Sequence, residues 1–373
     1  MNWDKIVGQK KLVQLLQDSI LDKRVSHAQL FLAPEGYGSL PLALAYAKAI
    51  LADENLTAAS KVEHLNHLDL HFSFPTFTEK NNSLSKRYFE EFRSLILENP
   101  YASLDDFTKL LESENKQFFI SADEMEAVGS SFSLKSFEGG TKILIIWRAD
   151  KMNSAGANKF LKFLEEPPAK TLIFLTAESA DDMLPTILSR CQIINVPRIE
   201  DEDIALALKS NYKLTEDRIN EIVHQAQGNY NEAIRLATHG DYASEFDELF
   251  VQWVRNAFMV KKKPEYLRHI IKWAREIASW NREKQKTFLD FCSEIFRLAL
   301  MQNYGKEDLV YKSVKVTGFR WQDFSKYIHG SNIESILEEI STAGYHIERN
   351  GNAKIVWTDM GIKLSRYIHR SAL

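Results

Sequence analysis

The residues best suited to chemistry form a short polar loop, Ser189-Arg190-Cys191. An arginine is permanently charged, and its rigid fork of N–H donors matches the oxygens of a phosphate. If it reaches across a subunit boundary, such a side chain can neutralise charge that develops on a transferred phosphoryl group. The same arginine could instead make an ordinary surface ion pair worth less than ~1 kcal/mol. Cys191 is best interpreted as a small buried apolar residue, because no histidine lies close by in sequence to activate its thiol.

A glycine-rich turn is the second place where the chain could meet phosphate, and it reads Pro34-Glu35-Gly36-Tyr37-Gly38-Ser39-Leu40. It follows a short apolar strand predicted over Gln29 to Ala33 and precedes a helix predicted from about Leu40 to Ala52. Strand, turn and helix in this order form the setting of a phosphate-binding loop, whose pattern is glycine, four residues, glycine, lysine, then serine or threonine. The order of elements therefore makes this turn a candidate nucleotide site.

The individual positions of that turn depart from the pattern. With Gly38 as the second glycine, Ala33 replaces the first glycine, Ser39 the lysine and Leu40 the hydroxyl residue. Ser39 brings no positive charge to the β- and γ-phosphates, and Leu40 offers no oxygen to a magnesium ion. We therefore expect the loop around Gly36 and Gly38 to be inert, a tight turn that lets strand and helix pack closely. Backbone amides at the helix start could still hold a nucleotide diphosphate, which is the less favoured alternative.

The stretch from Asn153 to Val196 must position Arg190. Apolar residues at helical spacing predict an amphipathic helix over its first third: Ala157, Phe160, Leu161 and Leu164. Ser154 can cap the start of this helix, and Pro167-Pro168 ends it. The apolar run Leu172 to Thr176 then suits a buried strand, and a polar loop leads from it to Arg190.

Helix, double-proline stop, buried strand and Ser-Arg-Cys, in this order and spacing, resemble the bacterial clamp-loader subunits of DNA polymerase III, most of all the delta-prime subunits. Earlier segments fit the same family: Val7-Gly8-Gln9, His27 to Phe31 and Glu138-Gly139-Gly140. Beyond about residue 200 the resemblance is loose. Short apolar strands alternate with helices over residues 1 to 196, which predicts a parallel α/β sheet. The resemblance implies the AAA+ arrangement of that sheet.

Relatives that hydrolyse ATP carry two further nucleotide elements, and the resemblance locates both in this sequence. The central strand Lys142 to Trp147 should end in Asp-Glu, which holds magnesium and polarises the attacking water, but these positions are Trp147 and Arg148. A second-sensor arginine should stand where the chain has Asn231. Asp150 remains nearby, and a loop or capping carboxylate is its better interpretation. The loss of separate parts of one active site argues against hydrolysis.

The resemblance also implies a role for the Ser189-Arg190-Cys191 loop. In the family this arginine points at the ATP of a neighbouring subunit, so Arg190 is expected to be an arginine finger acting in trans, with Ser189 and Cys191 supporting the loop. The implied protein is a non-catalytic subunit that braces ATPase subunits, together with a delta subunit, in a hetero-pentamer. That assembly places a sliding clamp on primed DNA. No cofactor is expected in this chain, since the neighbouring subunits bind the ATP.

Two other functions stay open. An ATP-hydrolysing motor subunit of the same assembly would bind ATP with micromolar affinity and hydrolyse it with magnesium, and the residues at four positions oppose it: Ser39, Leu40, Trp147 and Arg148. A nucleic-acid-binding module acting alone would show a strongly salt-dependent affinity. The formal net charge of −4 disfavours that module, because a stand-alone binder usually carries a global basic field.

Composition excludes several classes of protein. The chain has only two cysteines, Cys191 and Cys292, so it can build neither a disulfide framework nor a four-thiolate zinc site. Many relatives carry a zinc module where this chain has Asp53 to His71, and we expect that module to be absent. The histidines of this segment are expected to be solvated or capping residues: His64, His67 and His71. No apolar run approaches ~18 residues and the N-terminus lacks a signal-peptide pattern, so we expect a cytoplasmic protein without membrane contact.

Length and periodicity predict three domains. They are an α/β domain over residues 1–198 with a degenerate nucleotide loop, a small helical lid over 199–241 and an all-α oligomerisation collar over 242–373. In the collar, a basic stretch from Lys261 to Lys286 is interleaved with Trp273 and Trp280. This stretch could face DNA phosphates, although a solvated helical face over core tryptophans is favoured.

Overall fold

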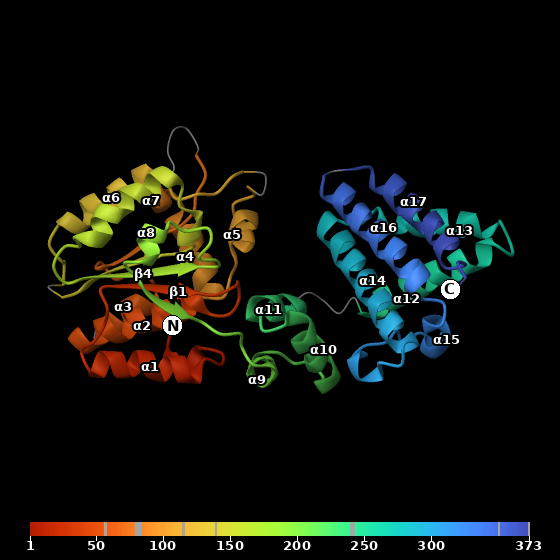
Figure 1. Ribbon diagram of the computed structural model, residues 1–373, viewed down its shortest axis with the longest axis horizontal. Helices are drawn as coiled ribbons and strands as arrows, with labels where there is room; N and C mark the ends of the chain where they lie inside the picture. Colours follow the sequence, from red (N-terminus) through yellow and green to blue (C-terminus); the bar gives the residue numbers. More distant parts are fainter. Residues whose placement is uncertain are drawn as a thin grey trace. The chain divides into compact units, whose positions relative to one another are not determined.

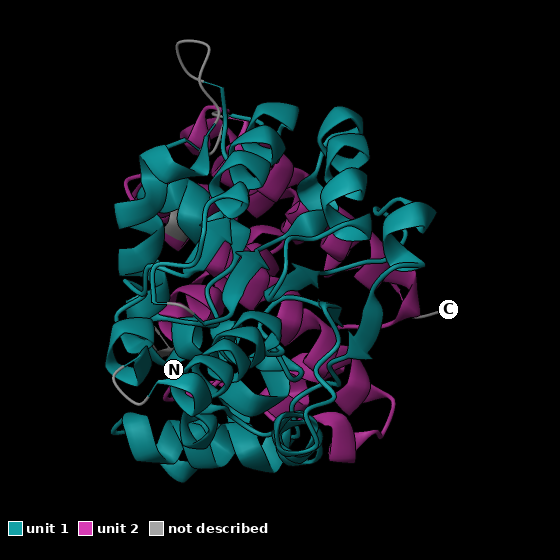
Figure 2. Ribbon diagram, turned by 90° about the vertical axis from the view of Figure 1, so that its left-hand side faces the viewer, with its two compact units in different colours: residues 1–238 teal, residues 239–373 magenta. Residues whose placement is uncertain are grey.

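The computed structural model describes residues 1–55, 58–78, 84–113, 116–138, 140–238, 243–349 and 351–371. Gly139 of the expected Glu138-Gly139-Gly140 segment lies outside the described residues. The chain forms two compact units, residues 1–238 and 239–373 (Figure 2). The first unit contains the predicted α/β domain and the described part of the predicted lid, and the second contains the collar. The finer division into three domains stays a prediction.

A five-stranded parallel sheet forms the centre of the first unit. Its strands are β1 Ala28–Leu32, β2 Leu70–Ser73, β3 Lys142–Ile146, β4 Thr171–Ala177 and β5 Gln192–Asn195. They lie in the order β2-β3-β4-β1-β5, and every neighbouring pair is parallel. β3 is buried along its whole length, as expected for a central strand covered on both faces. The predicted α/β class is confirmed.

Helices cover both faces of this sheet (Figure 1). The first unit contains α1 Lys10–Leu21, α2 Ser39–Glu54, α3 Ala58–Glu63, α4 Phe89–Glu98, α5 Leu104–Leu110, α6 Ala122–Ser133, α7 Ser154–Glu165 and α8 Pro185–Leu188. Alternate side chains of a strand point to opposite faces, so Ile145 enters the core with α2, α4 and α5, while Leu144 enters the core with α6 and α7. Arg190 and the turn after β1 are therefore anchored in one rigid layered domain.

The N-cap of helix α7 lies one residue earlier than predicted. The predicted cap Ser154 is instead the first helical residue, and Asn153 caps the helix because its Oδ1 accepts a hydrogen bond from the N–H of Gly156 at 2.7 Å. The helix ends at Glu165, just before Pro167-Pro168, as predicted. Its apolar stripe is buried through Ala157, Phe160 and Leu164, while Leu161 is only partly buried.

Three short helices complete the first unit: α9 Asp201–Asn211, α10 Glu216–Ala226 and α11 Tyr230–Thr238. They form a small core of their own around Ile204, Leu208 and Ile222. Tyr101, which belongs to the α/β part, is also a member of this core. The helical unit thus packs on the α/β part through an aromatic residue.

The described residues of the second unit form helices and no strand. The main helices are α12 Ala243–Val260, α13 Tyr266–Ile277, α14 Arg282–Asn303, α15 Trp321–Ser325, α16 Gly330–Glu348 and α17 Ala353–Tyr367. Trp273 is completely buried and stacks on Trp253 with ring centroids 5.1 Å apart, so it is a core residue as favoured from the sequence. The cations of α13 lie on its opposite, exposed face, among them Arg268 and Lys272. Among the described residues, every helix of the chain is too short or too polar to cross a lipid bilayer.

Candidate functional site

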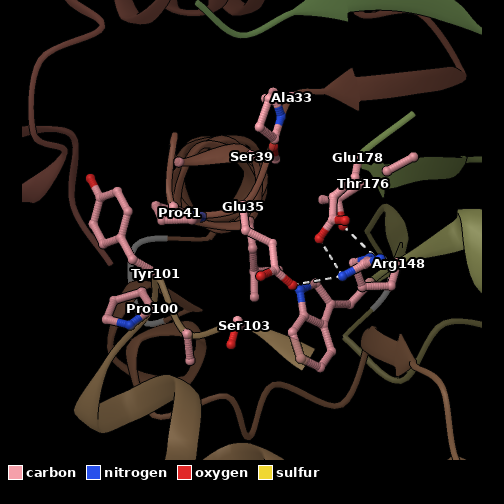
Figure 3. A pocket seen from close by; sticks show the side chains of 17 residues that line it. Ala33, Glu35, Ser39, Pro41, Pro100, Tyr101, Ser103, Arg148, Thr176 and Glu178 are labelled. Carbon is pink, nitrogen blue, oxygen red and sulfur yellow. Dashed lines mark hydrogen bonds and ion pairs between the residues drawn. The ribbon is translucent and has the colours of Figure 1, made fainter. Parts of the chain in front are cut away.

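The turn after β1 is packed tightly around its two glycines. Gly36 (φ +74°) and Gly38 (φ +103°) both adopt the left-handed backbone conformation, which costs glycine little. A Cβ atom on Gly36 would lie 1.8 Å from Oδ1 of Asn229, and one on Gly38 would lie 3.3 Å from the ring of Tyr101. The space that remains is a cavity of about 40 Å³ (Figure 3). It can hold a few water molecules, whereas small-molecule sites usually measure roughly 300–1,000 Å³.

The predicted residues of the turn line this small cavity together. Gly36, Gly38, Ser39 and Leu40 border it, and so do the two residues at the lost acidic positions, Trp147 and Arg148. Trp147 is buried, and its ring packs on Phe92 with centroids 5.5 Å apart. An indole in an aromatic core has no oxygen to offer a metal ion. The structure thus brings the predicted positions together around one cavity, and their role in nucleotide chemistry stays a prediction.

Tyr101 packs against this turn and joins three segments of the chain. Its Oη accepts a hydrogen bond from the backbone N–H of Val7 at 2.8 Å, and its ring meets that of Tyr230 edge-on with centroids 4.9 Å apart. Only 5% of Tyr101 is exposed, and burial raises the pKa of its phenol well above the usual range. The neutral ring covers Gly38, where a phosphate-binding loop needs open backbone.

Arg148 is the second residue after β3 and lies buried among three carboxyl groups, of which Figure 3 shows those of Glu35 and Glu178. Its Nη2 donates to Oδ2 of Asp150 at 2.9 Å, its Nη1 donates to Oε1 of Glu35 at 2.8 Å, and it also pairs with Glu178. Burial alone would lower the pKa of Arg148, but the hydrogen bonds and charge of Asp150 outweigh burial and raise this pKa. Its backbone is left-handed, with φ +59°, which is uncommon for a residue with a side chain.

The three carboxyl groups around Arg148 differ in burial and in protonation. Burial, followed by a hydrogen bond with Glu35, raises the pKa of Glu178 to about 8, so Glu178 is mostly protonated at neutral pH. Asp150 is almost fully buried and binds the guanidinium through both oxygens. The predicted loop or capping carboxylate is thus an ion-pair partner of Arg148 in the short segment after β3. The sequence signalled neither Glu35 nor Glu178, because both reach Arg148 from other strands' ends.

Asn231 connects the helical unit to the α/β part. Its Nδ2 donates to Oδ2 of Asp106 at 2.7 Å, and its Oδ1 accepts from Nδ2 of Asn99 at 2.6 Å. The backbone N–H of Tyr230 also donates to the carbonyl oxygen of Gly36 at 3.0 Å. Side-chain and backbone hydrogen bonds thus hold α11 against the turn after β1 and against the α/β part.

Arg190 lies at the surface, in the turn between α8 and β5. Its side chain is 37% exposed, and its Nη2 lies 2.6 Å from Oε1 of Glu165. Its Nη1 donates to the carbonyl oxygen of Thr186 at 2.8 Å and to Oγ of Ser189 at 3.3 Å. Cys191 is half-buried, and burial raises the pKa of its thiol to about 11, which disfavours the reactive thiolate.

The two candidate sites lie at opposite edges of the sheet. The turn after β1, Arg148 after β3 and Glu178 after β4 follow the ends of parallel strands and share the carboxyl edge. Arg190 precedes β5, whose first residue Gln192 pairs with Gln29 near the start of β1, so Arg190 lies at the amino edge. The five residues of β1 span ~16 Å between these edges. Arg190 therefore cannot serve the turn of its own chain.

In the segment from Asp53 to His71, where we expect no zinc module, two histidines make polar contacts within the chain. His67 is buried, its Nδ1 accepts from the N–H of Asp69 at 3.1 Å, and its Nε2 lies 3.5 Å from Oε2 of Glu138. His64 is exposed and bonded to Ser60 O at 2.8 Å. Burial lowers the pKa of His71. In the part of the chain that the structure describes, no group of three His, Cys, Asp or Glu side chains is placed to hold a metal ion.

A protein-family model described as "DNA polymerase III, delta subunit" matches residues 8–200, which is just over half of the chain. This chain belongs to that family. The match covers the sheet, the turn after β1 and the Ser189-Arg190-Cys191 loop. The predicted resemblance to the delta-prime subunits is confirmed, and the AAA+ arrangement of the sheet stays a prediction.

Individual relatives come from two groups of subunits. DNA polymerase III subunit delta' of Bacillus subtilis (strain 168) is 27% identical over 251 residues, covering 63% of this chain and 61% of that protein. Subunit tau of the same organism is 20% identical over 386 residues, covering 99% of this chain and 62% of that protein. The matches thus span about three fifths of each relative. A solved gamma subunit-related protein from Thermotoga maritima covers 95% of this chain and 99% of its own at 16% identity, with a TM-score of 0.38, too low to bear on the fold.

Proposed function

We propose that this chain is a non-ATPase, delta-prime-like subunit of a DNA polymerase III clamp loader. In this role it braces the ATPase subunits of a hetero-pentamer that includes a delta subunit. It supplies Arg190 in trans to ATP held by its neighbour. The observation that carries the proposal is the position of Arg190, which is exposed at the amino edge of the sheet while the chain's own phosphate-type turn lies at the carboxyl edge.

The residues at the carboxyl edge of the sheet support the proposal that this chain does not hydrolyse ATP. A magnesium-nucleotide site needs open backbone N–H groups, a lysine for the phosphates and acidic residues for the metal. Here the ring of Tyr101 covers Gly38, and the guanidinium of Arg148 already neutralises the nearby carboxylates. A nucleotide entering this turn would have to displace a buried tyrosine and disturb the ion pairs of Arg148 with Glu35 and Asp150. No cofactor is expected in this chain.

Arg190 has the chemistry that the neighbour's site would require. A guanidinium placed beside a transferring phosphoryl group stabilises its developing charge, and such a finger increases turnover by roughly 10³- to 10⁵-fold. In this proposal, Ser189 and Cys191 fix the turn from which the side chain projects, because Oγ of Ser189 accepts from Arg190 and Cys191 packs against the core with α7. The assembled ring then uses ATP to open a sliding clamp and place it on primed DNA. A cytoplasmic location fits this role.

A motor ATPase of the same assembly is the second candidate, favoured by one observation. The similarity to subunit tau extends over 99% of this chain, further along the chain than the match to the delta' subunit. Against it stand Ser39 and Leu40 in the turn and Arg148 after β3. Magnesium-dependent ATP hydrolysis by the purified chain would establish this second candidate.

The test of the proposal is reconstitution of the clamp loader with Arg190→Ala. We expect assembly to be retained and single-turnover ATP hydrolysis at the adjacent site to fall by roughly 10³-fold. Arg370→Ala is a control, because this cation lies in the second unit and pairs with its own chain through Ser335 and Ser331. Unchanged hydrolysis in an intact Arg190→Ala complex would contradict the proposal.

A further inference from the structure

Arg190 does not extend freely into solvent but folds back onto its own chain. Its Nη2 pairs with Glu165 at 2.6 Å, and its Nη1 is held by the carbonyl oxygen of Thr186 at 2.8 Å. Both terminal nitrogens of the guanidinium thus have an intramolecular acceptor. The two charged side chains are 37% and 49% exposed, so another ligand can approach the pair from solvent.

The position of Glu165 at the end of α7 favours an ion pair between its carboxylate and a cation. Glu165 is the last residue of α7, where the partial negative charge of the helix C-terminus disfavours an anion. The following Pro167-Pro168 ends the helix and limits where this last turn can move. A neighbouring guanidinium relieves the repulsion between Glu165 and the helix end.

We infer that Glu165 is a positioning residue that holds Arg190 in a folded-back state and competes with a polyphosphate for the guanidinium. This inference rests on the proposed function, in which the polyphosphate is the ATP of the neighbouring subunit. A solvent-exposed ion pair is weak, so it can be exchanged. A triphosphate carries several negative charges and offers the same bidentate geometry to the guanidinium, so it replaces the single carboxylate when the neighbour binds ATP.

The adjacent Glu166 provides a matched control. It is also exposed and lies one residue further along, at the C-cap of α7. Among the described residues no ion pair to Glu166 is formed, whereas Glu165 pairs with Arg190. Neutralising either glutamate removes one negative charge from the same helix end. Only neutralising Glu165 releases the guanidinium.

The experiment compares Glu165→Gln and Glu166→Gln in the reconstituted clamp loader, each with Arg190 intact and with Arg190→Ala. With Arg190 intact, we expect Glu165→Gln to lower the KM for ATP at the adjacent site by about two- to five-fold, the range set by a surface ion pair, and to leave kcat unchanged. Glu166→Gln should behave as the unmodified complex. In the Arg190→Ala background, Glu165→Gln should have no effect on KM.

The outcomes separate this inference from the proposed function. If Arg190→Ala leaves hydrolysis unchanged, the proposed function fails. If Arg190→Ala lowers hydrolysis but the two glutamine variants have equal KM values, the positioning role of Glu165 is overturned. A higher KM in Glu165→Gln would also overturn it, because Glu165 would then assist binding and not compete with it. Thermal unfolding of each variant verifies that the folded chain is compared throughout.

Discussion

Arg148 and Arg190 stand at opposite edges of one parallel sheet, and their surroundings differ sharply. The side chain of Arg148 is 8% exposed and contacts three carboxyl groups, of which those of Glu35 and Glu178 come from distant segments of the chain. The side chain of Arg190 is 37% exposed and pairs with one carboxylate at the end of a helix. Both residues carry the same permanent charge. Burial and the number of partners decide that one is fixed inside the fold while the other can exchange its partner.

The same contrast holds for the two edges as a whole. At the carboxyl edge, Tyr101 and Asn231 join the α/β part to α11, and Arg148 binds carboxyl groups within the α/β part. At the amino edge, the Ser189-Arg190-Cys191 turn holds a partly exposed cation that pairs with Glu165. The proposed function assigns a loss of phosphate chemistry to one edge and its retention to the other, which is structurally feasible because the edges are built from different strand ends.

The largest expected difference between the edges concerns stability. Arg148→Met leaves buried carboxyl groups without their cation and should lower the free energy of unfolding of the first unit by ~3–5 kcal/mol. Arg190→Met, the matched change at the surface, should lower it by less than ~1 kcal/mol. Urea unfolding followed by circular dichroism measures both values. Equal losses for the two variants would remove the distinction between a fixed and an exchangeable arginine.

A smaller effect is expected from removing one hydrogen bond at the carboxyl edge. Tyr101→Phe keeps the ring over Gly38 but leaves the N–H of Val7 without its acceptor, so we expect a loss of ~1–2 kcal/mol in the free energy of unfolding. Hydrogen exchange should also become faster at Val7. Protection of that amide unchanged from the parent chain would show that Tyr101 does not tie the N-terminal segment to the turn.

Asn231→Ala should have a comparable or slightly smaller effect. It removes the hydrogen bonds to Asp106 and Asn99, and both of these side chains can turn partly towards water, so we expect ~1 kcal/mol. The change should appear as faster hydrogen exchange in α11, while amides of β3 keep their protection. Faster exchange in β3 as well would indicate that Asn231 supports the sheet and not only the helical unit.

A further expected difference is a pH dependence of stability that arises from Glu178. Its pKa is raised to about 8 in the folded chain from 4.5, so it favours folding fully below about pH 4.5, and this contribution is lost as the pH rises through about 8. Glu178→Gln cannot ionise, so it should lack this decline. Urea midpoints of both chains between pH 5 and pH 9 should diverge as the pH rises. Parallel profiles would show that Glu178 is already ionised in the fold.

The sequence predicted the elements whose signals are local. The period of α7, its proline stop and the apolar run of β4 predicted the setting of Arg190, and the order of strand, turn and helix predicted the turn after β1. A comparison of single positions with the nucleotide-binding pattern already shows in the sequence that the lysine and the acidic residues are missing. Asn153 instead of Ser154 as the cap is a shift of one residue, because either side chain can accept the same N–H.

The side chains that fill the carboxyl edge could not be predicted in this way. Tyr101 lies more than sixty residues beyond Gly38 in sequence, and Glu35 and Glu178 reach Arg148 only because parallel strands bring their ends together. A single tyrosine or glutamate in a sequence does not indicate which distant residue its side chain will contact. The replacement of Asp-Glu by Trp147 and Arg148 indicated a loss of metal binding, but the structure was needed to show that Arg148 compensates the remaining carboxyl charge.

Titration of the purified, full-length chain with magnesium-ATP by calorimetry tests most directly whether the turn after β1 is closed while Arg190 faces outward. With Tyr101 and Arg148 in place, we predict no binding at millimolar ATP and no magnesium-dependent hydrolysis. Saturable binding with a micromolar Kd, weakened by Ser39→Glu in the turn, would contradict this account, because the chain would then hold its own nucleotide.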